Sequence, residues 1–219
     1  GMTLPGTAAI PAVHADRLRA AEATGKQALE TARLGLTPSK LITGYSVENA
    51  LRVLLALGGS TNGILHLTAL AGRLGIKISL KRLNELSDTT PVLINLKPTG
   101  VGYMEDFHAA GGMGTLLREL QPLLHLDCQT ITGETMRQRL EDSPDYVDRT
   151  IIRNLEEPFE AVGGLVALFG NLAPGGAILK RSAADPNLFE HTGRAVVFES
   201  LEDLADRIDC DDLDVKADD

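Results

Sequence analysis

The residues with the greatest chemical potential follow a short apolar run in the middle of the chain. Lys97 stands in a glycine-bearing loop after residues 91–96, and Glu105 and His108 follow in a short polar stretch. The Lys97 ammonium could hold a carboxylate as a point charge. Glu105 or His108 could exchange a proton if burial moved its pKa toward neutrality. This spacing indicates a loop that binds an acid or moves a proton.

The elements around this loop allow two interpretations. Residues 91–96 contain β-branched side chains and are typical of a buried strand. A strand that enters a glycine-bearing loop before a helix is where open α/β sheets place ligands. The simpler interpretation needs no ligand, because Glu105 and Asp106 would stabilise the positive end of a helix dipole. Spacing alone leaves both open.

Composition excludes several classes of protein. The formal net charge of −9 argues against binding to nucleic acid or to an anionic membrane, since both need a basic surface. Cys128 and Cys210 are too few and too far apart for a disulfide framework or a zinc knuckle. No apolar run approaches the length of a bilayer span, and no signal peptide begins the chain. We therefore expect a cytoplasmic protein.

Helical periodicity dominates the chain up to about residue 150. Apolar residues at helical spacing predict helices at 13–34, 47–57, 63–74, 81–86, 113–120 and 132–140. The helix at 63–74 is apolar nearly all round, so we expect it to be buried on most sides, with His66 as a core histidine. Residues 76–80 are a short strand candidate.

Short β-like runs between glycines replace this pattern after residue 150. They predict strands at 150–152, 165–169, 177–179 and 195–198, and Ser200 is placed to cap a helix through 208. The prediction is an α/β fold with a helix-rich domain at 1–150 and the start of a β-rich domain at 151–219. A domain with only these few strands would have uncovered sheet edges. Both ends of the sequence therefore look cut from a longer chain.

Several uncommon strings resemble one enzyme family. They are GGSTN at 58–62 followed by LHL at 65–67, SDTTP at 87–91, NLKP at 95–98 and YMEDFHAAGG at 103–112. Together they are similar to the dihydroxy-acid and sugar-acid (aldonate, phosphogluconate) dehydratase family. The resemblance extends over essentially all 219 residues.

The resemblance implies a hydro-lyase that converts a 2,3-dihydroxy carboxylic acid into a 2-keto acid. In the family an iron–sulfur cluster, [2Fe–2S] or [4Fe–4S], acts as Lewis acid, Mg²⁺ holds the substrate, and a serine takes the C2 proton. The family fold is an α/β domain followed by a β-rich swivelling domain. A homo-oligomer and a small hydroxy-acid substrate are also implied.

The chain departs from the family in its metal ligands. The cluster cysteines of the family precede residue 1, its catalytic serine and last Mg²⁺ ligand follow residue 219, and neither Cys128 nor Cys210 has a matching context. We expect the segment to hold no catalytic or metal-binding residue, to bind no cofactor and to be inactive alone. An alternative is a non-catalytic module for acid binding or oligomerisation. The substrate-cleft candidates are Thr61, Lys97, Glu105 and His108.

Overall fold

The computed structural model of the protein describes residues 1–141 and 145–215. The chain forms two compact units, Gly1–Ala183 and Ala184–Asp219. The helices of the first unit are α1 (Asp16–Arg33), α2 (Pro38–Leu41), α3 (Gly44–Ala56), α4 (Thr61–Arg73), α5 (Leu80–Asp88), α6 (Met104–Ala109), α7 (Gly112–Glu119), η1 (Gln121–Leu123), α8 (Met136–Glu141) and η2 (Arg181–Ala183). The second unit contains η3 (Pro186–Leu188) and α9 (Leu201–Arg207).

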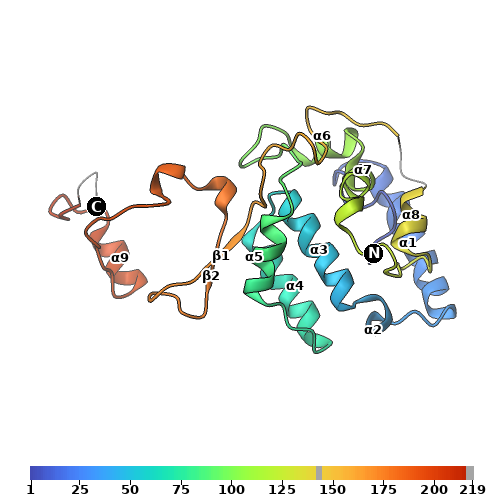
Figure 1. The fold of residues 1–219 in the computed structure, drawn as a ribbon, viewed down its shortest axis with the longest axis horizontal. Helices are drawn as coiled ribbons and strands as arrows, with labels where there is room; N and C mark the ends of the chain where they lie inside the picture. The colour runs from blue at the N-terminus through green and yellow to red at the C-terminus, as the bar shows by residue number, and fades with distance from the viewer. Residues whose placement is uncertain (142–144, 216–219) are drawn as a thin grey trace. The chain divides into compact units, whose positions relative to one another are not determined.

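The described part of the chain is of mixed content and mostly helical, with a small two-stranded sheet. Strands β1 (Val166–Leu168) and β2 (Ala177–Leu179) pair antiparallel, with Ala167 opposite Ile178. Helix α5 packs on β1, and α3 lies beside both α4 and α5 (Figure 1). Among the described residues no helix combines the length and the apolar character needed to cross a bilayer.

The strands at 165–169 and 177–179 are confirmed, whereas other strand predictions are wrong. Residues 76–80 and 195–198 form no strand in the described chain. A strand needs a neighbour that satisfies its backbone groups, and an isolated apolar run has none. The predicted α/β architecture is therefore present only as mixed helix and strand content.

Residues 91–96 are extended and buried, as predicted, but they form no continuous ladder. Val92 bridges to Glu160 and Ile94 bridges to Ile152. The Leu93 N–H donates instead to the carbonyl of Ala56 at 2.9 Å, at the end of α3. The backbone groups of this run bond to three distant segments, namely the end of α3, residues 151–153 and residues 159–160, in place of a single partner strand.

The prediction that α4 is buried on most sides is wrong. Ile64 and Ala71 are buried, whereas Leu65 is 67% exposed and Leu70 is 56% exposed. His66 is exposed as well, so it is no core histidine in this structure. A helix that is apolar on all sides has many side chains that could be buried. Which of them are buried depends on the elements that pack against the helix.

Two apolar clusters meet at α3 and form the core of the first unit. One surrounds Phe107 of α6 and includes Leu93 and Leu116. The other joins α3 to α5 and the sheet through Leu55 and Leu86. The first cluster seats the helix that carries Glu105 and His108, so this packing sets the position of two candidate residues.

Candidate functional site

The loop that carries Lys97 is held by its own backbone. The Lys97 N–H donates to the Gly102 carbonyl at 2.9 Å, and the Gly102 N–H donates to the Asn95 carbonyl at 3.1 Å. The Asn95 side chain accepts from the Val101 N–H at 3.0 Å and donates to the Thr150 carbonyl at 3.2 Å. These hydrogen bonds fix the conformation of the loop.

The Lys97 side chain is exposed on this loop and contacts an aromatic neighbour. Its ammonium donates to the Tyr103 hydroxyl and lies 4.1 Å from the centroid of the Tyr103 ring. A cation held by a hydroxyl oxygen and a ring face loses freedom of motion. The pair thus presents an oriented positive charge at the start of α6.

The polar stretch of α6 serves first as a helix start. The Tyr103 N–H donates to an Asp106 carboxylate oxygen at 2.7 Å, which satisfies a backbone group outside the first turn. Glu105 is exposed in the same turn. His108, at the other end of α6, is half-buried with its ring edge-on to His14 at 6.1 Å. Lys97 and His108 therefore have different neighbours.

Thr61 is the exposed first residue of α4, and the turn before it approaches the Lys97 loop. Gly58 adopts φ +57°, a left-handed conformation that favours glycine. A Cβ on Gly58 would lie 3.9 Å from Thr99 Oγ1 and 3.7 Å from Ser182 Oγ. The fold thus brings the turn before Thr61, the Lys97 loop and η2 together. That these residues line a substrate cleft stays a prediction.

Arg181 and Ser182 are residues that sequence reasoning did not select for this region. Arg181 Nη2 donates to the Gly163 carbonyl at 2.9 Å and to the Ser87 hydroxyl at 3.2 Å. Ser182 lies against Gly164, whose backbone closely approaches Gly58. Adjacent glycines at 163 and 164 are the available signal in the sequence, because such a pair marks close backbone approach.

Replacing Gly164 by alanine is expected to destabilise the chain by about 1–3 kcal/mol, the usual cost of overpacking. The new Cβ would lie 2.8 Å from the Gly58 Cα and 3.0 Å from Ser182 Oγ, and backbone at Gly58 cannot move aside easily. Chemical denaturation measures the change. Gly170→Ala is the matched control, since nothing lies within 4 Å of its Cβ and its cost should stay below about 0.5 kcal/mol. Equal stability of the two variants would contradict the prediction.

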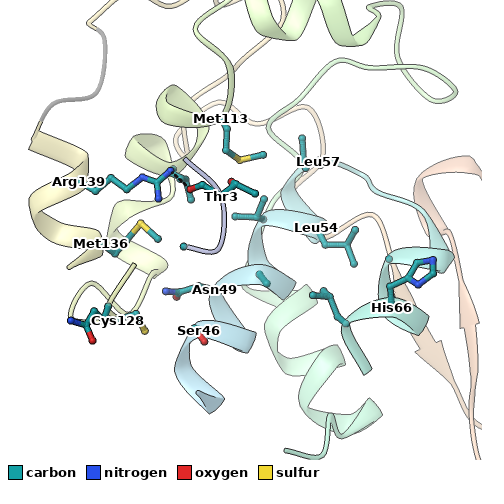
Figure 2. Close-up of a pocket in the computed structure, with 17 residues that line it drawn as sticks. Thr3, Ser46, Asn49, Leu54, Leu57, His66, Met113, Cys128, Met136 and Arg139 are labelled. Atoms are coloured by element: carbon teal, nitrogen blue, oxygen red, sulfur yellow. Dashed lines mark hydrogen bonds between the residues drawn. The ribbon is translucent and has the colours of Figure 1, made fainter. Parts of the chain in front are cut away.

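A cavity of about 410 Å³ lies elsewhere in the same unit, between α3, α4, α7 and α8. Figure 2 shows Arg139 and Met136 on one side of it and Leu54 and Leu57 on the other. None of the four cleft candidates is among its lining residues. Cys128 is at its wall.

The donors of the chain do not fit an iron–sulfur cluster. Within residues 1–141 and 145–215 no group of three or more His, Cys, Asp or Glu side chains could hold a metal ion. Cys128 and Cys210 are free thiols in different units. Burial also raises the pKa of the Cys128 thiol, which disfavours the thiolate that binds iron. No step can be derived through a cofactor on this segment.

Comparison with known proteins places the chain. Residues 1–139 match the dihydroxy-acid/6-phosphogluconate dehydratase N-terminal model, and residues 150–219 match the corresponding C-terminal model. A dihydroxy-acid dehydratase of Caldicellulosiruptor saccharolyticus is 45% identical over 210 residues, which cover 95% of this chain and 38% of the relative. An L-arabinonate dehydratase of Rhizobium leguminosarum bv. trifolii is 42% identical over 217 residues, which cover 98% of this chain and 37% of the relative.

The chain thus spans less than two fifths of the length of these curated relatives. Within that span, both family models match and the resemblance noted in the sequence is confirmed. The chain belongs to the dihydroxy-acid/6-phosphogluconate dehydratase family.

Proposed function

We propose that the protein to which this chain contributes is a hydro-lyase that dehydrates a 2,3-dihydroxy carboxylic acid to a 2-keto acid. The observation that carries the proposal is the pair of consecutive family matches over residues 1–139 and 150–219. Relatives named for dihydroxy-acid and L-arabinonate dehydration support a dihydroxy acid or a sugar acid as substrate. The reaction is elimination of water.

In this proposal the segment forms part of the wall of the active site and helps to position the substrate. An iron–sulfur cluster and Mg²⁺ would supply Lewis acidity, with ligands outside this chain. Residues 1–150 end the α/β domain, and the swivelling domain begins at 151. Lys97, oriented by Tyr103, would hold the substrate carboxylate, and Thr61, Glu105 and His108 would border the cleft.

The proposed enzyme is a cytoplasmic homo-oligomer. The exposed leucines of α4, Leu65 and Leu70, support self-association because exposed apolar side chains favour burial against another surface. Its partners are then its own copies and a small hydroxy acid.

The test is dehydration by the chain expressed with its flanking coding sequence. In that protein Lys97→Met should lower kcat/KM about 10–100-fold, the value of one hydrogen bond to a charged group. His108→Gln should also lower it, without loss of thermal stability. Lys77→Met is the matched control, because Lys77 is an exposed lysine outside the candidate region.

Unchanged kcat/KM in both variants would remove Lys97 and His108 from the cleft and leave the hydro-lyase proposal in place. A protein that contains iron–sulfur cluster and Mg²⁺ yet dehydrates neither dihydroxy acids nor sugar acids would overturn the proposal itself. Binding of such acids without turnover would favour the non-catalytic module.

A further inference from the structure

The cavity between α3, α4, α7 and α8 is mostly apolar, with Ser46, Asn49, His66 and Gln129 among its polar lining residues. Its hydrocarbon wall comes from Val53, Leu54, Leu57, Leu67, Met113, Leu117 and Met136. None of the described residues that line it is Asp or Glu. At about 410 Å³ it falls in the size range of small-molecule pockets. Its chemistry favours a ligand with a hydrocarbon body.

Arg139 brings a guanidinium to this cavity, and Glu134 acts on it electrostatically without accepting a hydrogen bond from it among the described residues. Its Nη2 donates to the Thr3 carbonyl at 2.9 Å, whereas its Nη1 is buried and has no acceptor among the described residues. By contrast, Arg82 and Arg149 of the same unit are paired with carboxylates. A half-buried guanidinium with one nitrogen left without an acceptor is costly, and an incoming carboxylate would supply that acceptor and a closer counter-charge.

The desolvation of Arg139 agrees with this geometry. Burial lowers the pKa of its guanidinium, and Glu134 opposes that effect only as the weaker influence. A carboxylate from a ligand would restore the balance of charge and accept in the bidentate geometry that guanidinium offers. Nη1 is covered in this structure, so the flexible side chain must turn toward the cavity to present it.

We propose that this cavity binds a short-chain monocarboxylate, with the carboxylate on Arg139 and the hydrocarbon tail against Leu54, Leu57 and Met113. The site is separate from the proposed dehydration cleft, because Thr61, Lys97, Glu105 and His108 do not line it. A polyhydroxy acid fits it poorly, since most of its hydroxyls would face hydrocarbon without a partner. The ligand class therefore differs from the substrate class of the family relatives.

Cys128 offers a direct readout of occupancy. It lies in the cavity wall and is half-buried, whereas Cys210 is exposed in the other unit. The rate of thiol alkylation at each cysteine can be followed by peptide mass spectrometry while hexanoate is titrated. We expect alkylation of Cys128 to slow in a saturable manner and that of Cys210 to stay constant.

Three comparisons make the assay specific for a carboxylate on Arg139. Arg139→Met should weaken the protection by hexanoate about 10–100-fold. Arg139→Lys should retain part of the protection, because lysine keeps the positive charge but lacks the two parallel N–H donors of a guanidinium. 1-Hexanol, which has the tail without the charge, and gluconate, which has the charge without the tail, should protect weakly or not at all. Circular dichroism melting confirms that the variants are folded.

The proposal is overturned if hexanoate gives no protection, if Arg139→Met is protected as well as the parent, or if hexanol protects equally. The relatives are longer than this chain, so a polypeptide segment is the rival occupant. The same titration is therefore repeated on the chain with its flanking sequence. Protection of Cys128 there without hexanoate would assign the cavity to that segment and overturn the proposal.

Discussion

Phe107→Ala is expected to lower the free energy of unfolding of the first unit by about 3–5 kcal/mol. Phe107 is fully buried and is the largest side chain of the cluster that includes Leu93 and Leu116. Its removal leaves a cavity that the surrounding core cannot fill by relaxation. Since Phe107 seats α6, the loss should also loosen Glu105 and His108, which flank it on the same helix.

Chemical denaturation with two companion variants tests this effect. Phe107→Leu keeps most of the volume and should cost less than Phe107→Ala. Met104→Ala changes a half-exposed residue of the same helix and should cost below about 0.5 kcal/mol. An average mutation lowers the free energy of unfolding by about 1 kcal/mol. If Phe107→Ala lowered it by no more than that, α6 would not be held in place by this side chain.

Lowering the pH is expected to reduce the free energy of unfolding of the first unit, because it protonates Glu48. Arg82 and His125 hydrogen-bond to its carboxylate, at 2.8 Å and 2.9 Å, and the Arg82 bond is the main reason that the pKa of Glu48 falls from 4.5 to about 2. A carboxyl whose pKa is depressed by folding stabilises the protein above its unfolded pKa. That stabilisation is lost as the pH falls from about 4.5 to about 2, as the folded carboxylate takes up a proton.

The loss amounts to about 2 kcal/mol after allowance for solvent screening at the half-exposed Arg82. Denaturation between pH 7 and pH 2 measures it. Glu48→Gln should be less stable than the parent at pH 7 and close to it at pH 2. Glu22→Gln is the matched control, because Glu22 pairs with Lys26 in an exposed position of α1 and should change little at either pH. A parallel pH dependence of the parent and Glu48→Gln would contradict the assignment.

The local sequence was sufficient to predict most helices and some of their ends. Ser200 caps α9 as predicted, with its hydroxyl accepting from the Asp203 N–H at 3.1 Å. The predicted helix at 47–57 instead begins at Gly44, because Thr43 and Ser46 form a reciprocal capping pair three residues earlier. Caps and helical periodicity depend on groups within about one turn, so neighbouring residues carry most of the information.

The family was also determined by the sequence itself, through strings such as residues 58–62 and 103–112. The sequence likewise marked Lys97 as a cation in a glycine-bearing loop. It contained no local sign that Tyr103 would hold the Lys97 ammonium. That contact depends on how the loop folds back, which the bonds from Lys97 to Gly102 and from Gly102 to Asn95 establish.

Only the tertiary structure decided burial and the grouping of distant residues. Leu65 and Leu70 are as apolar as Leu55, yet they are exposed while Leu55 is buried against α5 and the sheet. Arg139 lines a mostly apolar cavity only because α3, α4 and α7 face α8. Periodicity describes one segment, whereas burial and charge compensation are set by segments that meet from far apart along the chain.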